Sequence, residues 1–205
     1  MAPFPDLFIL DLEASPSGQR ATSNRLTTRD RSHISRSVIG VASILAISEE
    51  GKKATLRTLE GEEAAILAEI DDLLLKGQDH LLVTFNGTHF DLPLLRVRAL
   101  VNHLFGLRAI GSIWNRPHQD VMKLFPGPLS LSGCSELLGL DIDERVMTRR
   151  QKCEADVVRT YLVWLHFTAL THGDGSVLLQ GWRTLASDLS GPSLAHLVPL
   201  FDGLE

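Results

Sequence analysis

The chain has 205 residues, of which 44% are hydrophobic and 22% are charged, and its formal net charge at pH 7 is −5. This size and apolar content predict one globular domain, residues 1–205, rather than two. The negative charge argues against a protein that coats nucleic acid nonspecifically, because that affinity comes mostly from Lys and Arg on phosphates, but it does not exclude an enzyme with local basic patches. The sequence has neither an apolar run of membrane-spanning length nor a signal-peptide pattern at its start, which predicts a soluble cytoplasmic protein.

The first third of the chain carries β-strand signals. Residues 7–12 form a short apolar run, and residues 37–48, "SVIGVASILAIS", are rich in β-branched side chains. The turn sequence "SEEGKK" then leads into residues 54–59, in which apolar and polar side chains alternate. Together the last two segments predict a β-hairpin.

The rest of the chain is predicted to be mostly helical. Apolar residues recur at helical spacing over 62–76, and "HLLVTFNG" at 80–87 indicates a buried strand closed by Asn-Gly. Everything after about residue 90 is predicted to be helical with Pro- and Gly-rich breaks, and His118 and Asp120 are expected at the start of one of these helices. This order of elements predicts a mixed sheet flanked by helices.

A long basic loop separates the first two predicted strands. It spans about residues 14–36 and holds five arginines against one acid. Loops of this length in compact domains are usually functional or disordered. A solvated loop and a phosphate-contacting arm are both compatible with this composition. Its position directly after Asp11 and Glu13 favours the arm, with Arg20 and Arg25 as candidate substrate contacts.

Two carboxylates, Asp11 and Glu13, stand at the end of the first apolar run. Residues two apart in a strand point to the same face, so these side chains are neighbours while Leu10 and Leu12 face the opposite way. Two close carboxylates repel one another unless a cation or solvent relieves the repulsion, and hard divalent ions prefer such oxygen ligands. Taken alone, the pair is better explained as an exposed strand end.

Two further acids follow predicted secondary-structure boundaries. Asp91 lies just before Leu92-Pro93, which resembles a helix start, so Asp91 is alternatively a helix N-cap or the acid of a capping box begun by Thr88. Asp156 lies near the start of a long predicted helix, beside its apolar stripe, where a buried acid needs a partner. Exposure near the helix start is the alternative for Asp156.

Taken together, "ILDLE", "FNGTHFD" and "CEADVVRTYLVWL" resemble the three motifs of the DEDD superfamily of 3′-5′ exonucleases. The resemblance runs from about residue 6 to the C-terminus. It is nearest to predicted exonucleases related to the proofreading domain of family B DNA polymerases. It implies an α/β fold with a ribonuclease-H-like mixed β-sheet flanked by α-helices and a helical C-terminal half.

The resemblance also implies a function and a site. Asp11, Glu13, Asp91 and Asp156 are then the catalytic, metal-binding carboxylates for two Mg²⁺ or Mn²⁺ ions, which activate water and stabilise the charge of phosphodiester hydrolysis. The partner is the 3′ end of a single-stranded nucleic acid, DNA in preference to RNA. Asn86 matches the turn that approaches the terminal nucleotide in that family.

The sequence departs from the family pattern at one catalytic position. The family has Tyr four residues, or His five residues, before the last Asp, and here Lys152 and Gln151 stand at those places. Lysine is a poor base among carboxylates, which favour its charged form, but Lys152 is able to bind phosphate or water. The alternative is an ion pair with Asp156 four residues later.

The roles of two arginines and the activity of the whole chain have alternatives. Arg149 and Arg150 are candidate contacts to the phosphates of the strand, or alternatively part of a solvated helix face. The chain as a whole is alternatively a noncatalytic module of the same fold that binds nucleic acid or a protein partner. An endonuclease of similar fold is the third alternative.

Overall fold

The computed structural model describes residues 5–16, 34, 37–48, 50–125, 127, 129–140 and 142–201. Within these residues, five strands form one sheet in the order β3-β2-β1-β4-β5. The pairs β1–β2 and β2–β3 are antiparallel, whereas β4 runs parallel to both β1 and β5. The predicted mixed sheet is confirmed. Its strands are β1 Leu7–Pro16, β2 Ser37–Ser48, β3 Lys53–Glu60, β4 Leu81–Thr84 and β5 His118–Asp120.

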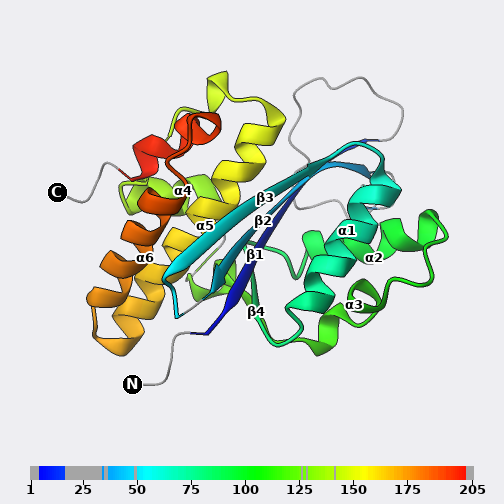
Figure 1. Ribbon diagram of the computed structural model, residues 1–205, viewed down its shortest axis with the longest axis horizontal. Helices are drawn as coiled ribbons and strands as arrows, with labels where there is room; N and C mark the ends of the chain where they lie inside the picture. The colour runs from blue at the N-terminus through cyan, green and yellow to red at the C-terminus, as the bar shows by residue number, and fades with distance from the viewer. Residues whose placement is uncertain are drawn as a thin grey trace.

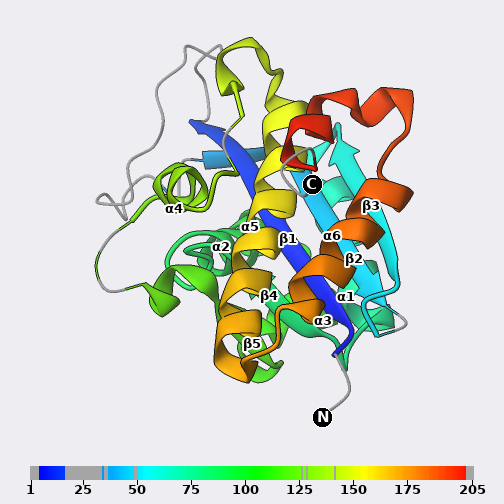
Figure 2. The same cartoon turned by 90° about the vertical axis from the view of Figure 1, so that its left-hand side faces the viewer.

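Helices cover both faces of the sheet (Figure 1, Figure 2). On one face lie the long helix α5 and the helix α6 that packs beside it, and on the other face lie α1, α2 and α3. The helix bounds are α1 Glu63–Lys76, α2 Asp91–Val101, α3 Arg108–Gly111, α4 Leu131–Leu137, α5 Arg149–His172 and α6 Ser176–Asp188. The 3₁₀ helices are η2 Ile113–Asn115, η3 Val121–Leu124, η4 Glu144–Val146 and η5 Pro192–Leu200.

The alternation of side chains along β1 divides the core in two. Leu7 and Ile9 join the core under α5 and α6, whereas Leu10 and Leu12 join the core under α1, α2 and α3. Asp11 follows the same alternation, so it lies on the α5 face of the sheet. The predicted separation of the carboxylates from Leu10 and Leu12 is therefore confirmed.

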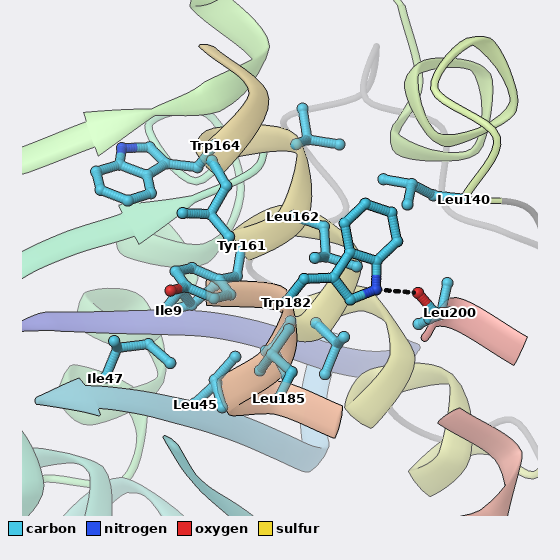
Figure 3. Close-up of a cluster of buried hydrophobic side chains, with 14 of the residues drawn as sticks. Ile9, Leu45, Ile47, Leu140, Tyr161, Leu162, Trp164, Trp182, Leu185 and Leu200 are labelled. Carbon is cyan, nitrogen blue, oxygen red and sulfur yellow. Dashed lines mark hydrogen bonds between the residues drawn. The ribbon is translucent and has the colours of Figure 1, made fainter. Parts of the chain in front are cut away.

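The core on the α5 face is closed by the C-terminal segment (Figure 3). Tyr161 of α5 and Trp182 of α6 belong to this core, together with aliphatic side chains of β1 and β2 such as Ile9 and Leu45. The indole nitrogen of Trp182 donates a hydrogen bond of 2.9 Å to the carbonyl oxygen of Leu200, which ties η5 to α6. Burying such aromatic surface stabilises the fold by about 2 kcal/mol per side chain.

The predicted elements match the structure with one exception. The hairpin and the helix over 62–76 are present, and β1 continues four residues beyond its predicted end. The prediction that everything after about residue 90 is helical is wrong at β5, because His118 and Asp120 belong to a strand. The three polar residues of β5 carry no apolar run and pair only with β4. Asp120 nevertheless caps the following 3₁₀ helix, since its side chain accepts a hydrogen bond from the backbone of Met122.

No helix in the described part of the chain combines the length and apolar character that a membrane crossing needs.

Candidate active site

Three carboxylates from two elements meet on the α5 face of the sheet. One oxygen from each of Asp11, Glu13 and Asp156 lies within 4.8 Å of the others. Asp11 and Glu13 share a face of β1, and α5 crosses β1 so that Asp156 reaches them. The thiol of Cys153, on the preceding turn of α5, lies 3.4 Å from the carbonyl oxygen of Asp11, which fixes where the helix crosses the strand. The structure thus brings together three of the four predicted ligands.

A β-bulge shapes the strand beside this cluster. Glu13 lies opposite Val41 and Ala14 lies opposite Ile39, so Gly40 is the extra residue of β2. A Cβ atom at position 40 would lie 3.1 Å from Arg149 Nη1. Arg149 therefore crosses over β2 at the bulge, next to the strand that carries Glu13. Bulges of this kind bend a strand and redirect its side chains.

Asp91 lies beside the same cluster, at the start of α2. Asp91 is the first helical residue and Phe90 is the N-cap, so the alternatives of an N-cap or a capping-box acid for Asp91 are wrong. Its side chain is buried, and burial is the main cause that raises the pKa of Asp91 to about 8, with the charges of Asp120 and Glu13 adding to it. Hydrogen bonds from the backbone, including that of Leu12 in β1, lower this pKa in part.

A tight turn between β4 and α2 positions Asp91. The carboxylate of Asp120 accepts hydrogen bonds from the backbone nitrogens of Asn86, at 2.7 Å, and Thr88, at 3.1 Å. Asn86 is buried and has a φ of 64°, a left-handed conformation that Asn tolerates better than most residues. Asp120 is a residue of this site that the sequence interpretation treated only as a helix start.

Gly87→Ala is expected to destabilise the protein by about 1 to 3 kcal/mol, the usual cost of overpacking. A Cβ at position 87 would lie 2.2 Å from Thr84 Oγ1 and 2.4 Å from Thr84 Cβ, so the turn has to move. Urea unfolding measures the loss. Gly111→Ala, at a helical position with no atom within 4 Å of the added Cβ, is the control, and an equal loss in both variants would contradict this account of the turn.

The electrostatics of the cluster favour a cation. The pKa of Asp11 is raised well above its ordinary value, first by burial and then by the charges of Asp156, Asp91 and Glu13. Asp11 Oδ2 is buried and has no hydrogen-bond partner among the described residues. A divalent ion with a preference for oxygen ligands would satisfy this atom and relieve the repulsion. The donor set therefore fits Mg²⁺ or Mn²⁺.

The positions that depart from the family pattern have structural partners. Gln151 completes a capping box at the start of α5, since its side chain accepts a hydrogen bond of 2.9 Å from the backbone of Thr148. Lys152 is partly exposed, and its Nζ lies 4.0 Å from Glu144 Oε2. Lys152 therefore lies near the carboxylate of Glu144 in η4. Lys152 is also one helical turn from Asp156, on the same side of α5.

A buried arginine contacts the last carboxylate. Arg159 donates a hydrogen bond to Asp156 Oδ1 and another of 2.7 Å to Glu144 Oε1. The sequence interpretation missed both Arg159 and Glu144. The contact between Asp156 and Arg159 could have been predicted, because residues three apart on one helix are neighbours. Glu144 lies in a separate segment, and no sequence signal connects it to the site.

Arg150, another predicted substrate contact, forms its ion pairs away from the carboxylates. Arg150 pairs with Glu154 at 2.9 Å and with Glu60 at 3.0 Å, on the side of α5 that faces β3. Arg20 and Arg25 lie outside the described residues. A shallow surface depression between α6 and the β2–β3 turn contains none of the predicted site residues.

Comparisons with known proteins agree with this fold. Residues 31–120 match the family described as "Predicted 3'-5' exonuclease related to the exonuclease domain of PolB". This match includes Asp91 and excludes Asp11, Glu13 and Asp156. No curated protein matches the sequence.

Solved structures of low sequence identity share the fold. The family B DNA polymerase of the archaeon Pyrobaculum calidifontis is 15% identical with a TM-score of 0.55, over 95% of this chain and 27% of the polymerase. Exonuclease I of E. coli in complex with a 5cy-dT13 oligonucleotide is 13% identical with a TM-score of 0.54, over 88% of this chain and 43% of the exonuclease. Its zinc-bound complex with single-stranded DNA is 10% identical with a TM-score of 0.55, over 91% and 46%.

These comparisons confirm the resemblance that the motifs predicted. The chain has the ribonuclease-H-like fold of these exonucleases, and residues 31–120, less than half of its length, are similar to the exonuclease family. The chain spans less than half the length of the solved chains it resembles.

Proposed function

We propose that this chain is a divalent-metal-dependent 3′-5′ exonuclease that hydrolyses the terminal phosphodiester of single-stranded nucleic acid, with DNA as the substrate. The observation that carries the proposal is the meeting of Asp11, Glu13 and Asp156 within 4.8 Å, with Asp91 near enough for its charge to raise the pKa of Asp11. Two of these acids come from β1, one from α5 and one from α2, so the fold itself assembles the site. The match to the exonuclease family over residues 31–120 and the solved complexes of exonuclease I with single-stranded DNA support the reaction class and the substrate.

Each residue then has a role. Asp11, Glu13 and Asp156 hold the metal, with Asp91 as the fourth ligand beside them, and the buried Asp11 Oδ2 is the oxygen most in need of a cation. Bound Mg²⁺ or Mn²⁺ would act as a Lewis acid on the phosphate and lower the pKa of a water molecule. Lys152 offers a positive charge to the phosphate, and the turn at Asn86 faces the terminal nucleotide.

A noncatalytic binding module is the second candidate. One observation favours it: Gln151 is held in the helix cap and Lys152 lies beside Glu144, so neither repeats the Tyr or His of the family. Such a module would bind the end of a nucleic acid or a protein partner without cutting.

Incubation of 5′-labelled single-stranded DNA and RNA with Mg²⁺ or Mn²⁺ tests the proposal. We expect a ladder that shortens from the 3′ end of the DNA, and no ladder with Asp11→Ala, because Asp11 lies at the centre of the carboxylates. Circular single-stranded DNA is the control, since an exonuclease leaves it intact and an endonuclease cuts it. Intact linear substrates in every lane would overturn the exonuclease proposal in favour of the binding module.

A further inference from the structure

Arg159 has an unusual environment for an arginine beside a proposed metal site. Its side chain is 2% exposed, and one nitrogen, Nη2, donates to both Asp156 and Glu144. Its Nε is also buried and has no hydrogen-bond partner within the part of the chain that the structure describes. Because a guanidinium stays charged in proteins, Arg159 is a permanent cation held inside the fold by these two carboxylates.

Asp156, one of the two carboxylates that hold Arg159, is also one of the proposed metal ligands. Asp156 supplies an oxygen to the group that lies within 4.8 Å, and it also accepts a hydrogen bond from Arg159. Two cations, the guanidinium and a divalent ion, are therefore attracted to one carboxylate. The positive charge of the guanidinium weakens the binding of the ion, because the two cations repel one another strongly at this range in a partly buried site.

Glu144 offers the guanidinium a second acceptor. Its Oε1 lies 2.7 Å from Arg159 Nη2, and its Oε2 lies 4.0 Å from Lys152 Nζ. Glu144 thus stands between the two cations that α5 presents on the side of Asp156. By sharing the charge of Arg159, Glu144 reduces the hold of the arginine on Asp156.

We infer that Arg159 is a positioning residue that competes with the metal ion for Asp156, and that Glu144 sets the strength of this competition. The inference rests on the metal site of the proposed function and adds a regulator of its affinity. Two variants should then change metal affinity in opposite directions. Removing the charge of Arg159 frees Asp156 for the ion. Removing the charge of Glu144 leaves Asp156 as the one carboxylate that the described part of the chain gives Arg159.

Calorimetric titration with Mn²⁺ measures this competition without any need for nuclease activity. We expect Arg159→Gln to lower the Kd by about tenfold and Glu144→Gln to raise it by about threefold or more. Arg159→Lys keeps the charge and should return the Kd toward the wild-type value. The rise in Tm from EDTA to saturating Mn²⁺ should be larger in Arg159→Gln than in the wild type and smaller in Glu144→Gln.

Arg150→Gln is the matched control. It removes the same charge from the same helix, but the partners of Arg150 are Glu60 and Glu154, neither of which is among the proposed ligands. Its Mn²⁺ Kd should stay within about twofold of the wild-type value. If Arg159→Gln does not fold, the double variant Arg159→Gln/Glu144→Gln removes both partners of the buried pair and carries the same expectation of tighter binding.

The outcomes separate this inference from the proposed function. A higher Kd for Mn²⁺ in both Arg159→Gln and Glu144→Gln would overturn the proposed competition, and so would an unchanged Kd in Arg159→Gln. Arg159 would then be a structural residue. Binding of Mn²⁺ by Arg159→Gln but not by the wild type would support the competition and contradict a metal-dependent wild-type enzyme. Absence of binding in every folded variant would overturn both.

Discussion

In EDTA, the protein is expected to become less stable as the pH rises from about 6.5 to about 8. Burial raises the pKa of Asp91 to about 8, and it also raises the pKa of Asp11. The pKa of Asp91 lies far above the ordinary value of an unfolded aspartate, so in this range the folded state holds a proton on Asp91 that the unfolded state has released. The free energy of unfolding therefore falls with pH, by up to about 1.4 kcal/mol per pH unit for each such carboxyl.

Between about pH 6.5 and 8, other groups with shifted pKa values contribute little to the slope of the free energy of unfolding. Burial lowers the pKa of His118 and His196, which gives the opposite slope below about pH 6.5, and burial raises the pKa of Cys153, which matters only at higher pH. Urea unfolding at several pH values is the measurement.

Asp91→Asn is the variant that tests the origin of this slope. It should reduce the slope and unfold at a higher urea concentration than the wild type at about pH 8, because it removes a buried charge. With Mn²⁺ present, the slope should reverse, since the metal binds deprotonated carboxylates. A flat wild-type profile in EDTA would contradict the effect of burial on the pKa of Asp91.

Most of the sheet could be predicted because its strands bury apolar faces. The alternation along β1 and the β-branched run of β2 carry their own signal in the sequence, and both strands lie where they were expected. β5 could not be predicted, because three polar residues are placed as a strand only by pairing with β4. Tertiary context decides such short segments.

The proposed site was predictable only in part for a similar reason. Spacing along one element put Asp11 beside Glu13, and motif resemblance selected Asp91 and Asp156. Glu144 comes from a short 3₁₀ helix that no motif marks, and only the packing of η4 on α5 brings it to Arg159. Arg150 was selected from the sequence because it lies in a basic cluster near Asp156. In the fold its side chain pairs with Glu60 instead of lying at the carboxylates.

The proposed roles predict a graded loss of activity among the site residues. Asp156→Asn is expected to lower kcat by at least about a thousandfold, because it removes the negative charge of a metal ligand and replaces one carboxylate oxygen with an amide nitrogen, at a cost of several kcal/mol of charge stabilisation. Lys152→Met is expected to lower kcat by only about ten- to a hundredfold. Lys152 is 36% exposed and has Glu144 as its partner, so its charge is partly screened at the phosphate. Steady-state hydrolysis of 5′-labelled single-stranded DNA in Mn²⁺, at saturating substrate, measures both.

The control variant is Lys76→Met, which removes an exposed lysine that pairs with Asp72 on the far side of the sheet, and its rate should equal that of the wild type. Lys152→Arg should keep part of the activity, because the charge remains at a similar reach. If Lys152→Met is as inactive as Asp156→Asn, then Lys152 has taken over an essential step in place of the Tyr or His of the family. If Lys152→Met is fully active, the carboxylates and their metal suffice, and the departure from the family pattern at this position costs no activity.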